Sequence, residues 1–173
     1  HHLEALAHLS GLQREPPGEV WETLDIPTRE GLIAGLEDAE LVLPPGRTWH
    51  YSNLAFALLG EVVVRARGAS FGEVVAKEIL TPLGLTRTGL TPKAPLATPY
   101  FVDPYSDQVR VEPDLAVTET TSAAGWLWSS TGDLARWADF LALGDDRVLA
   151  KSHLDEMAKV QTMVDETGWT LGG

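Results

Sequence analysis

The chain has 173 residues, of which 25 are acidic and 13 basic, so its formal net charge at pH 7 is −12. This charge argues against binding to nucleic acids or anionic membranes, which both require clustered lysine and arginine. No apolar run approaches the roughly 20 residues that span a bilayer. Cysteine is absent, which excludes thiolate metal sites and thiol nucleophiles. We expect one globular domain covering residues 1–173.

The N-terminal part is expected to hold two helices separated by a long loop. A first helix covers about residues 3–10 and ends at Gly11, and residues 13–27 are polar and proline-rich. Thr28 is expected to cap the second helix. The opening residues 1–4, His-His-Leu-Glu, fit either native helix or the stub of an expression tag.

The most regular segment covers residues 54–67, where apolar residues recur at helical spacing. This spacing predicts a helix whose buried face carries Leu58, Leu59, Val62 and Val63. Gly68 is expected to end this helix. Ser70 and Glu73 are spaced as a capping box for the next helix, which Pro82 ends.

The C-terminal half contains fewer regular patterns. Residues 81–107 are rich in proline and predict irregular structure, whereas the alternation over residues 108–112 predicts a short strand. Ser130 is expected to cap a helix, and Ser152 with Asp155 is expected to cap the last one. The apolar side of the helix after Ser130 is expected to carry Leu134, Trp137, Ala138 and Leu141. In total, the patterns predict about five helices and two or three short strands.

The sequence contains no recognisable metal or phosphate motif. None of the histidines forms a His-Glu-x-x-His pattern or an i, i+4 pair, and no glycine-rich phosphate loop is present. These histidines are His1, His2, His8, His50 and His153. We therefore expect neither a metal nor a cofactor.

The residues Gly68-Ala69-Ser70-Phe71-Gly72 match the Gly-x-Ser-x-Gly elbow of α/β-hydrolases, with His153 following later in the chain. That elbow requires a strand before it, whereas the segment before Gly68 has helical periodicity. The pattern therefore favours a helix end followed by a helix cap. A small α/β-hydrolase with Ser70 as its nucleophile is the alternative, and a strand before Gly68 would support it.

Four blocks of the chain resemble motifs of the class C β-lactamases and their relatives, the penicillin-recognising DD-peptidases and serine esterases. The family motifs are Leu-x-His-x-Ser-Gly-Leu, Pro-Gly…Tyr-Ser-Asn…Leu-Leu-Gly, Ile-x-x-Pro-Leu-Gly-Met-x-x-Thr and Gly-Gly-Leu…Ser-Thr…Asp-Leu-Ala-Arg-Phe. The corresponding segments are residues 6–12 (LAHLSGL), 43–60 (LPPGRTWHYSNLAFALLG), 79–88 (ILTPLGLTRT) and 124–137 (AGWLWSSTGDLARW). Because the four matches occur in the family's order, they support the assignment together.

The resemblance implies an α+β fold of the β-lactamase/transpeptidase type. This chain would cover mainly its helical region, with a few short strands and an incomplete central sheet. In the family, the tyrosine of Tyr-x-Asn moves the proton during acyl transfer, so Tyr51 is the implied catalytic residue. A phenol can act as a base only beside a cation that lowers its pKa. Asn53 is implied to bind a neighbouring lysine and the substrate amide, while Ser52 faces away or closes the turn.

The family's nucleophile, the serine of Ser-x-x-Lys, has no counterpart in this chain. The residues three positions before the four lysines are Val74, Leu90, Val148 and Glu156. The Lys-Thr-Gly triplet of the closing strand is also absent. We therefore interpret the chain as the middle portion of a serine hydrolase that forms an acyl-enzyme, inactive alone.

The implied substrates of the whole enzyme are esters, D-amino-acid peptides or β-lactams. Apolar faces that pack on a sheet would then be covered by other parts of the same protein or by a second chain. The alternative from another functional class is a non-catalytic binding remnant of the same fold. The sequence does not distinguish an exported from a cytoplasmic bacterial protein.

Overall fold

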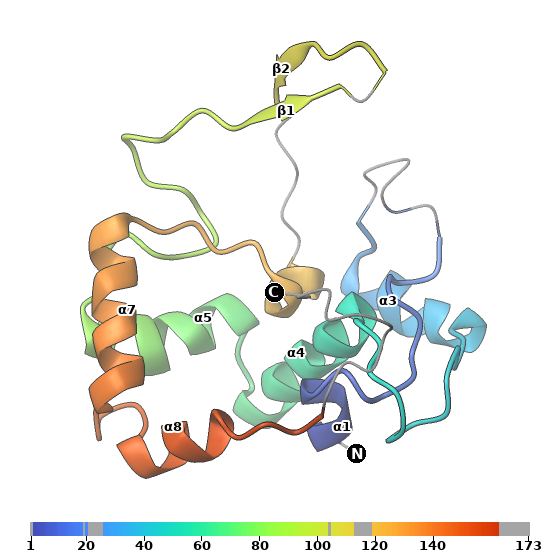
Figure 1. Ribbon diagram of the computed structural model, residues 1–173, viewed down its shortest axis with the longest axis horizontal. Coiled ribbons are helices and arrows are strands. Elements are labelled where there is room, and N and C mark those ends of the chain that lie inside the picture. The colour runs from blue at the N-terminus through green and yellow to red at the C-terminus, as the bar shows by residue number, and fades with distance from the viewer. Residues whose placement is uncertain (1, 19, 21–25, 104, 113–118, 163–173) are drawn as a thin grey trace.

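The computed structural model describes residues 2–18, 20, 26–103, 105–112 and 119–162. The described ranges are mainly helical, with one short antiparallel hairpin (Figure 1). The α-helices are α1 (His2–Leu6), α3 (Arg29–Gly35), α4 (Asn53–Arg67), α5 (Phe71–Val75), α6 (Thr81–Leu83), α7 (Thr131–Leu143) and α8 (Lys151–Met157). The 3-10 helices are η1 (Leu36–Asp38) and η3 (Glu119–Ala124), and η2 (Ala76–Leu80) is a π-helical turn. The strands are β1 (Tyr100–Val102) and β2 (Val109–Val111).

Helix α4 lies at the centre of the helical body and carries more buried residues than any other described helix. Leu54 and Ala57 pack with Leu32 of α3 into a core cluster. Helix η3 lies against α4 at Gly60, where an added Cβ would come within 2.7 Å of the Ala123 Cβ. Glycine therefore allows this close approach, and η3 brings residues 119–124 beside the start of the central helix.

The prediction that Leu58, Leu59, Val62 and Val63 form the buried face of α4 was wrong, although the helix itself was predicted correctly. Leu58, Leu59 and Val63 are only half-buried, and Val62 is 42% exposed. The buried residues are instead Leu54, Ala55, Ala57 and Gly60. The reason is that α4 is covered from α3 and η3, and an open groove runs past Leu58, Leu59 and Val62.

The N-terminal helix is shorter than predicted. Helix α1 ends at Leu6, and His8 adopts a left-handed backbone with φ of 55°. Gly11 does not cap this helix. It has φ of 72°, and an added Cβ would lie 2.0 Å from the carbonyl oxygen of Leu43. Gly11 is therefore needed for a close backbone crossing between the segments around residues 11 and 43.

The turn after α4 rules out the strand that a nucleophile elbow requires. Gly68 ends α4 in the left-handed conformation, with φ of 65°. Ser70 Oγ accepts a hydrogen bond from Glu73 N at 3.3 Å, and Ser70 N donates to Glu73 Oε2 at 3.0 Å. This is the predicted capping box. The α/β-hydrolase alternative with Ser70 as nucleophile was therefore wrong.

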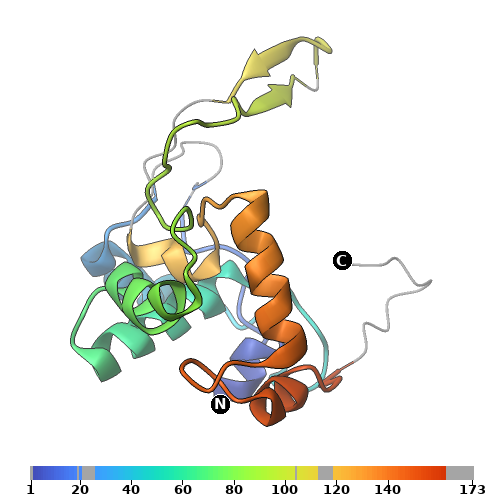
Figure 2. The same ribbon diagram turned by 90° about the vertical axis from the view of Figure 1, so that its left-hand side faces the viewer.

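Helix α7 is capped by Ser130 as predicted, but its apolar side does not face inward. Leu134 and Leu141 are 55% and 45% exposed, whereas Asp133 and Phe140 are buried. Ala138 is exposed and Trp137 half-buried. Figures 1 and 2 show α7 standing at the side of the helical body. The helix is oriented by its polar anchor at Asp133, and no described sheet covers the opposite side.

The last described helix begins differently from the prediction. Helix α8 starts at Lys151, and Ala150 occupies the N-cap position without a side-chain hydrogen bond. Ser152 and Asp155 lie inside the helix, where Asp155 forms an ion pair with Lys151. The capping pattern was misleading because the helix begins one residue before Ser152, and Asp155 then lies four residues after Lys151 and pairs with it.

The hairpin projects away from the helices in both views (Figures 1 and 2). Tyr100 pairs with Val111 and Val102 with Val109, and all strand residues are exposed. The strand predicted over residues 108–112 is present, but its partner lies within the segment predicted to be irregular. None of the helices in the described ranges is both long and apolar enough to cross a membrane.

Candidate active site

The start of α4 separates Ser52 from its two neighbours. Ser52 is fully buried, and its hydroxyl donates to the Gln13 carbonyl oxygen at 2.7 Å and accepts from Ala55 N at 3.0 Å. Its backbone is extended, so the side chains on either side of it point the other way. Ser52 thus closes the turn and caps the helix, and it presents Tyr51 and Asn53 on the opposite side.

Tyr51 and Asn53 both line a cavity of about 400 Å³. The Tyr51 side chain is 39% exposed, so the phenol can be reached from solvent. A cavity of this size can hold a group as large as a small organic ligand. The remaining lining residues are Arg14, Glu15, Pro16, Val20, Ile26, Thr121, Ala124, Gly125 and Trp126.

The amide of Asn53 is oriented by Glu15. Asn53 Nδ2 donates to the two carboxylate oxygens of Glu15 at 2.8 and 3.1 Å. The backbone N–H groups of Asn53 and Leu54 both donate to the carbonyl oxygen of Arg14, at 2.7 and 3.1 Å. Because the amide nitrogen is engaged, the Asn53 Oδ1 is the atom left to accept a hydrogen bond from a cation or an N–H group.

The ring of Tyr51 is held between a histidine and an arginine. Its centroid lies 4.6 Å from that of His8, and the Arg14 guanidinium carbon lies 5.6 Å from it, within cation–π range. Ser52 N donates to His8 Nδ1 at 3.1 Å. Burial, assisted by the charge of His50, lowers the pKa of His8. A neutral His8 therefore packs on the tyrosine and keeps its Nδ1 as an acceptor.

Thr121 of η3 also lines the cavity, but its hydroxyl oxygen is buried and does not face the open space. The residue is 9% exposed, and its Oγ1 has no hydrogen-bond partner in the part of the chain that the structure describes. The neighbouring Ser122 Oγ, in contrast, donates to the Glu119 carbonyl oxygen at 2.7 Å. A buried polar group without a partner costs about 1–3 kcal/mol, so a partner at Thr121 would be stabilising.

Sequence reasoning found Tyr51 and Asn53 but missed the residues that position them. His8 lies inside the motif-like block at residues 6–12, yet nothing in that block indicated contact with Tyr51. Arg14 and Glu15 lie in the segment of residues 13–27, which was predicted to be a loop. Thr121 lies in a segment for which neither a helix nor a strand was predicted. No local pattern reports these contacts, because each joins residues far apart in the chain.

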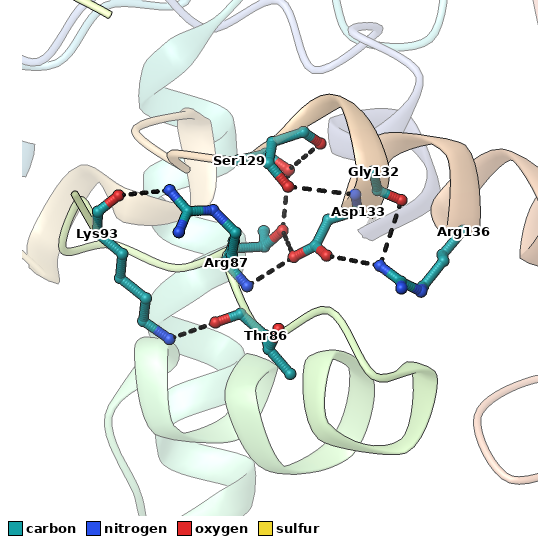
Figure 3. A network of polar contacts seen from close by, with 9 residues as sticks. Thr86, Arg87, Lys93, Ser129, Gly132, Asp133 and Arg136 are labelled. Carbon is teal, nitrogen blue, oxygen red and sulfur yellow. Dashed lines mark hydrogen bonds and ion pairs between the residues drawn. The ribbon is translucent and has the colours of Figure 1, made fainter. Parts of the chain in front are cut away.

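A separate polar network joins two further motif-like blocks (Figure 3). The carboxylate of Asp133, only 2% exposed, accepts hydrogen bonds from Arg87 N at 2.7 Å and Thr88 Oγ1 at 2.9 Å. Arg136 pairs with it at 3.1 Å. Burial by itself would raise the pKa of Asp133, but the two hydrogen bonds and the charge of Arg136 outweigh it and lower that pKa. The network fixes α7 to the turn after α6 and lies outside the Tyr51 cavity.

Among the described residues, no three histidine or acidic side chains lie close enough together to hold a metal ion. The polar groups that line the cavity are the phenol of Tyr51, the amide of Asn53, the carboxylate of Glu15 and the guanidinium of Arg14. Such a set can orient a carbonyl substrate and exchange a proton with it. None of the described residues that line this cavity is a serine.

The sequence model of the Beta-lactamase family matches residues 3–172. A D-alanyl-D-alanine-carboxypeptidase/endopeptidase, AmpH of Escherichia coli (strain K12), is 33% identical over 140 residues, covering 75% of this chain and 33% of the relative. Esterase EstB of Burkholderia gladioli is 34% identical over 130 residues, covering 68% of this chain and 32% of the esterase. The chain thus spans about a third of the length of these relatives.

The fold is also similar to that of solved structures. A D-stereospecific amidohydrolase from Streptomyces sp. superposes with a TM-score of 0.72 at 28% identity, covering 91% of this chain and 50% of the other. The predicted β-lactamase/transpeptidase-like fold is thereby confirmed. Within the described residues, the chain contains helices of this fold and one hairpin, but not a complete central sheet.

Proposed function

Since the chain belongs to the Beta-lactamase family, we propose that it supplies the Tyr-x-Asn side of an active site that cleaves esters or amides through an acyl-serine intermediate. The observation that carries this proposal is the arrangement at the start of α4. Tyr51 and Asn53 lie side by side on one cavity, while the serine between them is sealed in the core. A turn that served only to cap the helix would need the serine alone.

The proposed reaction has two transfers. A serine oxygen attacks the substrate carbonyl carbon, and its proton passes through the network that includes Tyr51 to the departing alcohol or amine. Water then attacks the acyl-serine ester, and the carboxylic acid product leaves as the serine recovers its proton. Tyr51 serves this cycle as a base when it takes the proton and as an acid when it returns it.

Asn53 is proposed to bind the substrate or its neighbouring cation. Glu15 engages the amide nitrogen of Asn53, so Oδ1 is presented as the acceptor. Glu15 is in this scheme a positioning residue, because it acts through Asn53.

The nucleophile is proposed to lie outside these 173 residues, since none of the lysines present has a serine three positions before it. The similar proteins include a carboxypeptidase, an esterase and an amidohydrolase. D-amino-acid peptides, esters and β-lactams are accordingly the proposed substrate classes. All three present a carbonyl carbon that a serine oxygen can attack.

The experiment treats the full-length protein with a chromogenic ester, a D-alanyl peptide and a penicillin, and locates the acyl adduct by mass spectrometry. We expect one adduct on a serine of a Ser-x-x-Lys motif, with Ser52 and Ser70 unmodified. A protein that binds these compounds without forming an adduct would instead be the non-catalytic remnant. An adduct on Ser70 would overturn the role of the Tyr51 cavity altogether.

A further inference from the structure

Trp126 adopts a backbone conformation that bulky residues avoid. Its φ is 75°, in the left-handed region that glycine adopts readily and a tryptophan rarely. In the Gly-Gly-Leu motif that residues 125–127 resemble, glycine occupies this position. A strained non-glycine residue persists only where its surroundings force it, and such residues cluster at functional sites.

The chain on both sides of Trp126 is fixed. On one side, η3 packs closely on α4 through Ala123 and Gly60. On the other side, Trp128 and Gly89 exchange two backbone hydrogen bonds, at 2.9 and 3.0 Å. The short segment between these anchors has to turn sharply, and Trp126 is the residue that makes the turn. The backbone therefore fixes the direction in which the side chain of residue 126 leaves the chain.

Trp126 stands between two cavities. It lines the cavity of about 400 Å³ that holds Tyr51 and Asn53, and it also lines a second cavity of about 490 Å³. Gly125 and Trp126 are the residues that both cavities share. The wall of the second cavity is largely apolar and includes Phe71, Val75, Ile79, Leu80, Leu85 and Trp137. A side chain at position 126 thus separates the candidate active site from an apolar space.

We propose that Trp126 is the residue that limits the size of the apolar group accepted beside Tyr51. With the indole in place, the site takes compact acyl groups. Without it, the two cavities join, and a longer alkyl chain can extend into the space between α5 and α7. The reaction in this inference rests on the proposed function, but the partition, meaning the separation of the two cavities by Trp126, does not depend on it.

The test compares p-nitrophenyl acetate with p-nitrophenyl octanoate in the full-length protein. The variants are Trp126→Gly and Trp126→Asn, because both residues tolerate a positive φ. We expect the octanoate-to-acetate ratio of kcat/KM to rise at least about tenfold in both, as a newly opened apolar pocket does for added methylene groups. Trp128→Ala is the matched control, because its side chain lines neither cavity, and its ratio should stay at the wild-type value.

An unchanged ratio in both Trp126 variants, or an equal rise in Trp128→Ala, would overturn the proposal. If the wild-type protein hydrolyses neither ester, the partition is judged by binding instead, and the proposed function fails only if the D-alanyl peptide and the penicillin also give no acyl adduct. Calorimetric titration with octanoate and acetate should then show about tenfold tighter octanoate binding in Trp126→Gly than in the wild type. Equal octanoate affinities would refute it independently of catalysis.

Discussion

A serine cap lies at each end of α4, since Ser52 caps α4 itself and Ser70 caps α5 just after Gly68 ends α4, yet the two caps differ in what they are connected to. At the first end, Ser52 bonds to Gln13, and the adjacent amides bond to His8 and Arg14, so the turn is held by residues far away in the chain. At the second end, Ser70 bonds only to Glu73 in an exposed capping box. Both sequences resemble catalytic motifs, but Ser70 and Glu73 line a separate cavity of about 520 Å³, and only the first turn places the Tyr-x-Asn pair on the candidate active site.

The difference shows that long-range contacts, and not the serine motif itself, determine whether the residues around a serine cap form a candidate active site. The capping box of Ser70 satisfies orphan helix amides and requires nothing from elsewhere in the fold. The Ser52 turn instead satisfies a distant carbonyl and thereby fixes the direction of two neighbouring side chains. Substitutions at the two ends should therefore separate catalysis, global stability and local helix capping.

The largest effect is expected at Tyr51. Tyr51→Phe keeps the ring on His8 and removes only the hydroxyl, so the melting temperature should stay near the wild-type value. The rate of acyl transfer by the full-length protein should fall about 10²–10⁴-fold, the usual range for an acid–base group. Steady-state hydrolysis of a chromogenic ester measures this. Wild-type turnover in a normally folded variant would remove Tyr51 from the proton network.

Ser52→Ala should be the most destabilising change at either cap. It removes the helix cap and leaves the Gln13 carbonyl and the Ala55 N–H buried without this partner. We expect a loss of about 2–4 kcal/mol in the free energy of unfolding, measured by urea denaturation. A loss below about 1 kcal/mol would show that the buried cap is no stronger than an exposed one.

The stability of the second half of α4 depends on the negative charge of Glu61, so the protein should become less stable in acid. Hydrogen bonds from Arg29 and Arg65, together with their charges, lower the pKa of Glu61 to about 2. Because the folded-state pKa is depressed, this stabilisation is present above the ordinary value of 4.5 and is lost as the pH falls toward 2.

Glu61→Gln tests this contribution. At neutral pH, the variant should be less stable than the wild type by about 1–2 kcal/mol, allowing for solvent screening of the two exposed arginines. Urea midpoints measured across the acid range should show the gap closing between pH 4.5 and 2. A gap that is independent of pH would mean that packing, and not charge, accounts for the loss.

The smallest effect is expected at Ser70. Ser70→Ala removes one exposed cap hydrogen bond, so the free energy of unfolding should fall by about 0.5–1 kcal/mol. Ester hydrolysis by the full-length protein should be unchanged, because Ser70 lies at the far end of α4 from the Tyr51 cavity. Loss of activity in a folded Ser70→Ala protein would contradict the comparison of the two ends.

Local chemistry explains which features were predictable from the sequence. The caps at Thr28, Ser70 and Ser130 were predicted correctly because a cap bonds to amides within three residues. The buried face of α4 was not, because periodicity identifies an apolar stripe but not the element that covers it. Gly11 was assigned to a helix end, whereas its role is a backbone crossing with Leu43 that depends on tertiary structure.

The same distinction applies to the candidate site. Tyr51 and Asn53 were identified through a contiguous motif, and the structure places both on one cavity. Glu15 lies 38 positions before Asn53, and Thr121 lies 70 positions after Tyr51. Neither spacing is fixed by any secondary-structure repeat. The contacts of these two residues follow only once α4, η3 and the segment before α3 are packed together.

The Asp133 network has a consequence for the motion of the segment after α6. The amide of Arg87 belongs to no helix or strand, yet it donates to a carboxylate that is almost completely buried. This proton can exchange with solvent only when α7 separates from the turn around residues 86–88. Its deuterium exchange should therefore be as slow as that of the α7 backbone, so an irregular segment would open together with a helix that begins more than 40 residues later in the chain.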